Sequence, residues 1–194
     1  MKRTKPRLAV LISGTGSNME AIAAACRSGL LDAEIAVVIS DNPNAAGLSR
    51  ARKMRIETVA CPYKRGIPRG ENEIPIIEEI RGRDVDWIVL AGYMKILTSD
   101  FVRTFPGRVV NIHPSLLPAF PGAHAIRDAL DAGADFTGVT IHIVDELVDH
   151  GPIIAQEEVV ILPGDTEETL ASRIHAVEHK LYPRTLQELI HEDI

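Results

Sequence analysis

The sequence predicts an α/β fold, in which an open, mostly parallel twisted sheet of about seven strands carries helices on both faces. Two nearly continuous apolar runs, 8–12 and 86–91, lack the polar alternation of a strand with one solvent-exposed face. Each run ends in a glycine-containing turn. With 194 residues, 45% of them hydrophobic, the chain is sufficient for a single domain, 1–194, with one sizeable core.

The other elements follow from periodicity and turn signals. Strands are expected at 8–12, 35–39, 57–60, 86–91, 108–112, 136–144 and 153–161. Helices are expected to begin near Met19 and to cover 44–54, 71–81, 124–132 and 167–179. Pro75 falls near the first turn of its helix, where a missing N–H is tolerated, whereas Tyr182-Pro183 should kink or restart the last helix. Strand 136–144 alternates apolar and polar residues, which favours a position nearer an edge of the sheet.

Charge and cysteine content exclude several classes of function. The net charge is −6 and the basic residues are scattered, except between Lys2 and Arg7, so no nucleic-acid-binding surface is expected. Cys26 and Cys61 indicate neither a disulfide framework nor a metal site, and they favour a cytoplasmic protein. The apolar run 8–12 is too short for a signal peptide, and no later run approaches membrane-spanning length. A small-molecule substrate is therefore expected.

The first strand ends in a glycine turn, Ser13-Gly14-Thr15-Gly16-Ser17-Asn18, and a helical pattern follows it. Free backbone N–H groups and the helix dipole at such a junction attract an anion. The third glycine of a dinucleotide fingerprint is missing, because Met19 occupies its position, so the phosphate of a smaller substrate is the better ligand. Asp41, after the second strand, is compatible with a ribose ligand or with an ordinary turn that starts a helix.

Asn111 and His113 alternate at the end of an apolar strand, so both side chains leave it on the same side. Pro114 and Pro118 restrict the turn that follows. A lone histidine at a strand end is commonly a structural one, but an amide that holds an oxyanion and a ring that moves a proton together suit acyl transfer. Ser115 lacks the sequence surroundings of a nucleophile and is interpreted as a turn residue.

Three of these segments end parallel strands, and ligands of open α/β sheets bind beyond the carboxyl ends of the strands. We therefore expect 14–18, 92–97 and 111–113 to meet at one cleft. The apolar residues of the second segment allow two interpretations, core packing or the lining of an apolar pocket. They are Met94, Ile96 and Leu97.

Four segments of the chain resemble the phosphoribosylglycinamide formyltransferase family, folate-dependent enzymes of purine synthesis. These segments are Ile12–Asn18, Leu90–Leu97, Asn111–Pro118 and the stretch from His142 through Asp149 to Pro152. The similarity extends over 8–183 and implies a Rossmann-like formyltransferase fold. The Asn-x-His-Pro-Ser-Leu-Leu-Pro segment and the downstream Asp149 are shared by the wider 10-formyltetrahydrofolate superfamily. Within that superfamily, the glycine loop and Glu178 favour the phosphoribosylglycinamide formyltransferase family.

The resemblance implies transfer of a formyl group from 10-formyltetrahydrofolate, a co-substrate, to the glycinamide amine of 5'-phosphoribosylglycinamide, without a metal. Asn111 and a protonated His113 would stabilise the oxyanion, and Asp149 would accept or relay the amine proton. The residues that it implies for the ribonucleotide are Gly16, Ser17 and Asn18 at the phosphate and Glu178 at the ribose.

The resemblance also assigns folate contacts. The residues implied for the pterin ring are Met94, Lys95, Ile96, Leu97 and Asn111, with loop 145–149 closing over it. Lys95 stands where an arginine is common in the family. Arg69 would reach the folate tail, and Arg65 competes for that role because the loop around it varies in length. The protein is expected to be a monomer or a homodimer.

Three other functions compete with this one. A formyltetrahydrofolate deformylase usually carries an extra N-terminal regulatory domain. A methionyl-tRNA formyltransferase carries a C-terminal RNA-binding domain. We expect neither, because the first strand begins near residue 7 and the chain ends at Ile194. A nucleotide-binding regulatory protein would use the glycine loop without catalysis, but it leaves Asn111, His113 and Asp149 unexplained.

Overall fold

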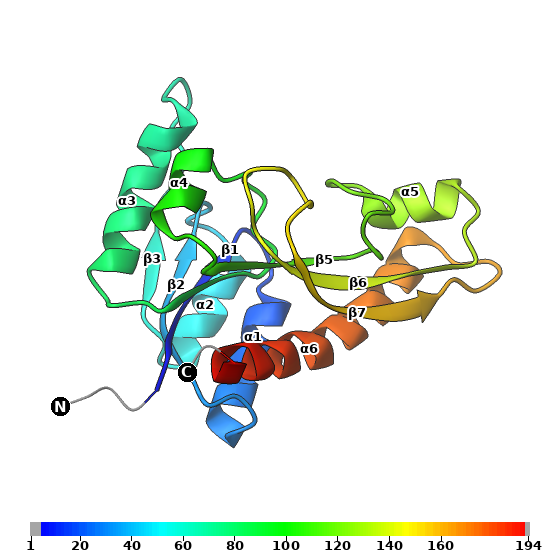
Figure 1. Ribbon diagram of the computed structural model, residues 1–194, viewed down its shortest axis with the longest axis horizontal. Helices are drawn as coiled ribbons and strands as arrows, with labels where there is room; N and C mark the ends of the chain where they lie inside the picture. Colours follow the sequence, from blue (N-terminus) through cyan, green and yellow to red (C-terminus); the bar gives the residue numbers. More distant parts are fainter. Residues whose placement is uncertain (1–4, 193–194) are drawn as a thin grey trace.

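A computed structural model describes residues 5–192, so that Lys2, Arg3 and Ile194 lie outside the described part of the chain. Its centre is a seven-stranded sheet with the order β3-β2-β1-β4-β5-β6-β7 (Figure 1). The strands are β1 (Arg7–Ile12), β2 (Glu34–Ser40), β3 (Thr58–Ala60), β4 (Trp87–Leu90), β5 (Val109–His113), β6 (Phe136–Ile143) and β7 (Ile153–Val160). The first five strands are parallel, and β6 and β7 are antiparallel to their neighbours. The predicted α/β class with a mostly parallel sheet is confirmed.

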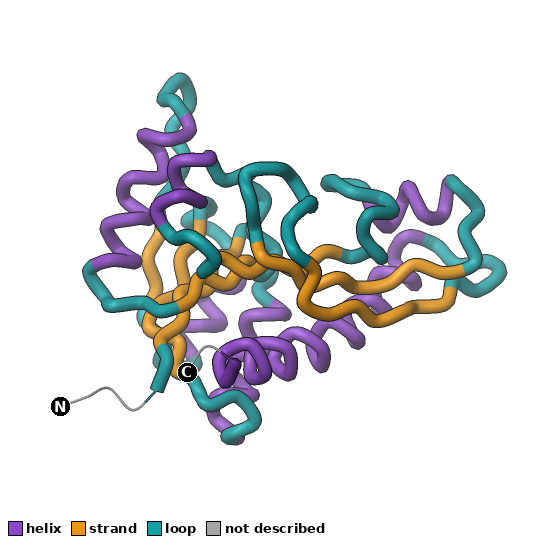
Figure 2. Tube along the Cα trace, viewed as in Figure 1, coloured by secondary structure: helices purple, strands orange, loops and turns teal. Residues whose placement is uncertain are grey.

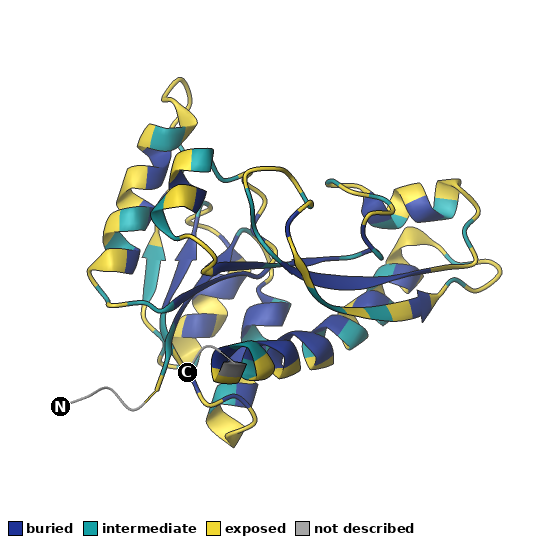
Figure 3. Cartoon of the chain, viewed as in Figure 1, coloured by how far each residue is buried: buried dark blue, intermediate teal, exposed yellow. Residues whose placement is uncertain are grey.

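Helices cover both faces of the sheet (Figure 2). They are α1 (Ser17–Ser28), α2 (Ala46–Lys53), α3 (Arg69–Arg81), α4 (Ser99–Thr104), α5 (Ala125–Asp131) and α6 (Glu167–Glu192). One apolar cluster joins the sheet to α1, α2 and α6, and a second joins the opposite face to α3 and α4. Successive residues of β1 enter opposite clusters: Leu8 and Val10 the first, Ala9 and Leu11 the second. From Leu8 to Ile12 the strand is apolar because both of its faces are buried, and Figure 3 colours most of it as buried.

The last helix does not restart at Pro183, which is one of the two outcomes predicted there, because α6 runs without interruption from Glu167 to Glu192. Tyr182 is fully buried, and its hydroxyl donates to the carbonyls of Leu90 and Val110, each at 3.0 Å. These contacts and the buried side chains on either side of Pro183 stabilise the helical path that the proline alone disfavours.

Strand β6 lies next to the edge strand β7, so the prediction of a position nearer an edge is confirmed. Its alternation does not mark a solvent-exposed face, however, because both of its faces are buried from Thr137 to His142. The polar residue Thr140 faces the turn after β5, where its hydroxyl donates to the Ser115 carbonyl at 2.6 Å. Helix α3 begins two residues earlier than expected, which moves Pro75 out of the first turn.

One short helix, α4, was not predicted at all. Its N-cap is Thr98, whose hydroxyl accepts a hydrogen bond from the Phe101 amide at 3.2 Å. Among the described residues, no helix is both long and apolar enough to cross a membrane.

Candidate active site

The three predicted strand ends lie at the same edge of the sheet. Strands β1, β4 and β5 are consecutive neighbours, and their carboxyl ends lead into 13–18, 91–97 and 114–118. Backbone and side-chain hydrogen bonds join the first two segments, from the Ser13 amide to the Gly92 carbonyl at 3.0 Å and from the Met94 amide to the Ser13 hydroxyl at 2.8 Å. The structure thus brings the predicted site segments together as expected.

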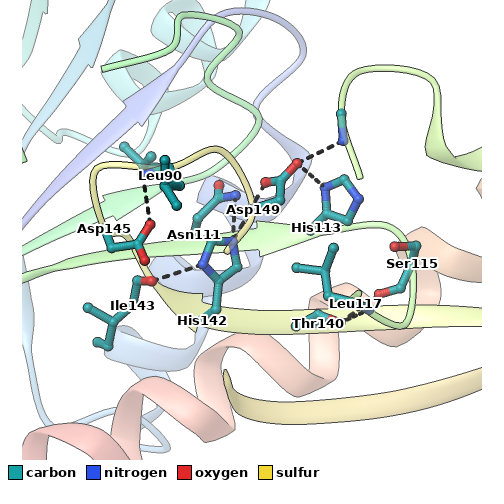
Figure 4. Close-up of polar contacts among 12 residues, drawn as sticks. Leu90, Asn111, His113, Ser115, Leu117, Thr140, His142, Ile143, Asp145 and Asp149 are labelled. Carbon is teal, nitrogen blue, oxygen red and sulfur yellow. Dashed lines mark hydrogen bonds and ion pairs between the residues drawn. The ribbon is translucent and has the colours of Figure 1, made fainter. Parts of the chain in front are cut away.

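Asn111 on β5 faces His142 on β6, because antiparallel pairing sets these two residues opposite each other (Figure 4). The Asn111 Nδ2 atom lies 3.2 Å from His142 Nε2, and His142 Nδ1 lies 2.9 Å from the Ile143 carbonyl. Nδ1 donates to that carbonyl, and Nε2 faces both the Asn111 amide and the Asp149 carboxylate. His142 therefore fixes which way the Asn111 side chain points, and it was not among the predicted site residues.

His113 is buried, with 4% of its surface exposed, and each of its ring nitrogens faces an oxygen. Nε2 lies 2.9 Å from the Phe120 carbonyl, and Nδ1 lies 3.5 Å from Asp149 Oδ2. A ring with a proton on each nitrogen can donate toward both oxygens. Figure 4 shows His113 and Asp149 turned toward each other from separate segments of the chain.

Asp149, in the loop after β6, contacts the other residues of the site through both oxygens of its carboxylate. Its Oδ2 accepts a hydrogen bond from the Gly122 amide at 2.8 Å, and its Oδ1 lies 3.8 Å from His142 Nε2. The pKa of the Asp149 carboxyl is lowered, first by His142 and then by the Gly122 amide and the charge of His113, against the opposing effect of burial. The carboxylate is therefore ionised at neutral pH.

The backbone around His113 is strained at two residues. Phe120 and Asp149 have φ angles of 52° and 51°, in the left-handed region that side chains other than glycine disfavour. One of these residues supplies the carbonyl and the other the carboxylate that face the His113 ring. Such strain is concentrated at functional sites, where surrounding contacts hold it in place.

The glycine loop has the geometry of an anion site. Gly16, the N-cap of α1, has φ 77°, and a Cβ atom there would lie 2.7 Å from Gly47 Cα. Inside the helix, Asn18 Nδ2 donates to Glu178 Oε2 at 2.8 Å, and both side chains are buried. Asn18 Oδ1 is buried without a hydrogen-bond partner among the described residues. The loop thus presents backbone donors beside an amide and a carboxylate.

The segment after β4 is exposed rather than packed into the core. Met94 and Ile96 are 70% and 54% exposed, so the core-packing interpretation is wrong for both, whereas Leu97 packs partly against the second cluster. Arg69 lies beside this segment, since its Nη1 donates to the Ile96 carbonyl at 3.3 Å. Arg65 is exposed in the loop that precedes α3.

The Ser115 side chain bonds the backbone of its own turn, which agrees with its interpretation as a turn residue. Its hydroxyl is buried and donates to the Ala119 carbonyl at 2.5 Å.

No cluster of three metal-ligating side chains occurs within residues 5–192. A surface hollow of about 640 Å³ lies between β3 and α3, lined in part by Cys61 and Asn72, but none of the predicted site residues lines it.

Residues 6–186 match the family model described as formyl transferase. The chain belongs to the formyl transferase family. The resemblance drawn from the sequence motifs is thereby confirmed.

Two kinds of curated protein are among the relatives that the chain matches. The phosphoribosylglycinamide formyltransferase of Bacillus subtilis is 42% identical over 184 residues, which cover 95% of this chain and 94% of the relative. The trifunctional purine biosynthetic protein adenosine-3 of Drosophila melanogaster is 43% identical over 98% of this chain. The chain spans only 14% of that trifunctional relative's length.

Solved structures give the same family. The crystal structure of phosphoribosylglycinamide formyltransferase from Bacillus halodurans superimposes with a TM-score of 0.92 at 46% identity and covers 97% of both chains. Glycinamide ribonucleotide transformylase 1 from Symbiobacterium toebii gives a TM-score of 0.94 at 42% identity, covering 97% of this chain and 89% of that one. The open sheet of this formyl transferase is therefore shared with solved members of the family.

Replacing Gly16 by alanine is expected to destabilise this formyl transferase by about 2 kcal/mol, because the left-handed backbone and the contact with Gly47 both disfavour a Cβ atom. Gly29→Ala is the matched control, since Gly29 has φ 79° at the other end of α1 but no atom within 4 Å of the added Cβ. Gly29→Ala should lower the free energy of unfolding by only about 1 kcal/mol, because only the left-handed backbone disfavours the added Cβ atom. Chemical denaturation measures both values, and equal losses would contradict the close-contact argument.

Proposed function

We propose that this chain transfers the formyl group of 10-formyltetrahydrofolate to the glycinamide amine of 5'-phosphoribosylglycinamide, in de novo purine biosynthesis. The observation that carries the proposal is the convergence of Asn111, His113 and Asp149 at the carboxyl end of β5. These groups lie at the sheet edge that also carries the N-terminus of α1 and the exposed segment 92–97. The names of relatives that match nearly the whole chain agree with this activity.

The ribonucleotide would bind at the glycine loop. Gly16, Ser17 and Asn18 would offer backbone N–H groups and the positive end of the α1 dipole to the phosphate. Glu178 accepts from Asn18 through Oε2, and its other oxygen would accept from a ribose hydroxyl. Both groups are buried, which favours a ligand that brings its own donors.

The folate would bind at the segment after β4. Met94 and Ile96 offer exposed apolar surface to the pterin ring. Backbone groups from Met94 to Leu97 would bond its polar edge, apart from the Met94 amide and the Ile96 carbonyl, which bond Ser13 and Arg69. Lys95 lies within this segment, and Asn111 lies near the end of the neighbouring strand β5. We assign Arg69 rather than Arg65 to the carboxylates of the folate tail, because Arg69 contacts the Ile96 carbonyl.

The reaction follows from the charges that develop. The amine nitrogen bonds to the formyl carbon, and the electron pair of the carbonyl moves onto oxygen, giving an oxyanion and an ammonium. Asn111 donates to the oxyanion, for which a preorganised donor is typically worth ~3 kcal/mol. His113 joins it by turning one of its two N–H groups from its present partner, the Phe120 carbonyl or Asp149, to the oxyanion. Asp149 accepts the ammonium proton, directly or through water, and relays it toward N10 of the folate. The bond from the formyl carbon to N10 then breaks, leaving tetrahydrofolate and the formylated amine.

The proposal extends to organisation and location. Residues 1–194 form a single formyltransferase domain that acts as a monomer or homodimer in the cytoplasm. Its partners are the two small-molecule substrates, with no nucleic acid, membrane or metal. The scatter of basic residues outside 2–7 and a net charge of −6 support the absence of a nucleic-acid partner.

The experiment that tests the function follows folate absorbance with and without the ribonucleotide. We expect deformylation of 10-formyltetrahydrofolate only when 5'-phosphoribosylglycinamide is present. Loss of the formyl group to water at the same rate without the ribonucleotide would identify a hydrolase. In that case the assignments of the glycine loop and Glu178 to the ribonucleotide would fall with the function.

A further inference from the structure

Asp41 makes contacts that its position in a turn does not require. It follows the last residue of β2, and only 9% of its side chain is exposed. Its Oδ1 accepts a hydrogen bond from the Ser13 hydroxyl at 2.5 Å, and its Oδ2 lies 3.5 Å from Lys95 Nζ. Both carboxylate oxygens are therefore used by residues from other strand ends.

Ser13 links Asp41 to the segment after β4 through two hydrogen bonds. Its oxygen accepts from the Met94 amide at 2.8 Å while its proton is donated to Asp41. Since β2, β1 and β4 are neighbours in the sheet, the carboxylate, the hydroxyl and the amide form a chain across three adjacent strand ends. The chain stops at Met94 and Lys95, two residues of the exposed segment.

We infer that Asp41 is a positioning residue for folate binding, whose carboxylate holds the first half of segment 92–97 through Ser13 and Lys95. The inference rests on the proposed function, because it takes that segment as the folate surface. Preorganising a surface lowers the entropy lost when a ligand binds to it. Asp41 thus raises folate affinity without touching the folate.

The second half of the segment has a separate anchor. Glu73 is buried on α3 and accepts from the Thr98 amide at 2.9 Å and from the Thr98 hydroxyl. The glycine loop is also held independently, since the Gly47 amide donates to the Gly14 carbonyl at 3.0 Å. Loss of Asp41 should therefore loosen Met94 and Lys95 while leaving the ribonucleotide site in place.

A carboxylate suits this position better than an amide. Asp41 faces a hydroxyl donor on one side and an ammonium on the other, so two acceptors are needed. Asparagine supplies one acceptor and one donor, and its NH₂ group would then face either Lys95 or the Ser13 proton. When Lys95 is also replaced by methionine, the amide can turn its oxygen to Ser13 without opposing a cation. The two substitutions should therefore be strongly non-additive.

The test measures affinity by isothermal titration, with a non-transferring deaza analogue of 10-formyltetrahydrofolate and, separately, with 5'-phosphoribosylglycinamide. Asp41→Asn should weaken analogue binding about tenfold, the usual size of a lost hydrogen bond to a charged group, and ribonucleotide binding by less than about threefold. In the Lys95→Met background the same substitution should weaken analogue binding by less than about threefold. Asp32→Asn is the matched control, because its exposed carboxylate pairs with Lys5 before β2, and it should change neither affinity.

Three outcomes would overturn the inference: unchanged analogue affinity, equal weakening of both ligands, or the same loss in both Lys95 backgrounds. If Asp41→Asn does not fold, Ser13→Ala removes the same link to Met94, and unchanged analogue affinity in that variant would also overturn it. Unmodified protein that binds the ribonucleotide but not the analogue would instead contradict the proposed function. The two failures are therefore distinguishable.

Discussion

Replacing His113 by alanine is expected to lower kcat about 1,000-fold while leaving the protein folded. The substitution removes a proposed oxyanion donor, a kind of group that typically contributes ~100- to 1,000-fold, and it removes the ring that faces Asp149 at 3.5 Å. Steady-state kinetics at saturating concentrations of both substrates measures the effect.

The matched control for this substitution is His124→Ala. His124 is exposed at the start of α5, in the same region of sequence as His113, and its loss should change kcat by less than about twofold. Circular dichroism and the melting temperature check that both variants fold. Near-normal turnover in a folded His113→Ala protein would refute the assigned role.

Replacing Asp149 by asparagine is expected to lower kcat by about 100- to 1,000-fold. The amide keeps the size of the side chain but cannot accept the ammonium proton, and its NH₂ group would oppose the Gly122 amide or the His113 ring. Asp131→Asn, at the exposed end of α5, is the control and should have no measurable effect on kcat. Equal rates for Asp149→Asn and the unmodified enzyme would show that the proton leaves by another route.

The pKa of Asp149 adds a dependence of stability on pH. Because the folded-state pKa is lowered, the carboxylate contributes stability that is fully present above its unfolded pKa of about 3.9. This contribution is lost as the pH falls through the lower folded-state pKa. The difference in unfolding free energy between the unmodified protein and Asp149→Asn should thus be constant near neutral pH and shrink below about pH 4.

The sheet could be predicted because its determinants are local. Runs such as 8–12 are apolar at every position, and the described structure buries them on both faces. Strand alternation alone was also enough to predict that Asn111 and His113 lie on the same side of β5. Helix α4 had a local signal that was missed, since Thr98 is a good N-cap residue before Ser99.

The rest of the site depends on long-range contacts. The role of His142 follows from its antiparallel register with Asn111, and sequence alone does not fix register between strands 31 residues apart. The continuity of α6 through Pro183 depends on Tyr182, whose hydroxyl reaches the carbonyls of two strands. The contact between Asp41 and Lys95 joins two loops that no periodicity relates.

The most direct test of the account is a single-turnover reaction with 10-formyltetrahydrofolate carrying an isotope label in its formyl group, followed by NMR. The account predicts that the label moves to the amine of 5'-phosphoribosylglycinamide, in equal amount to the tetrahydrofolate formed, and that the His113→Ala protein binds both substrates but transfers the label far more slowly. Label that appears as free formate, or transfer at an unchanged rate without His113, would contradict it.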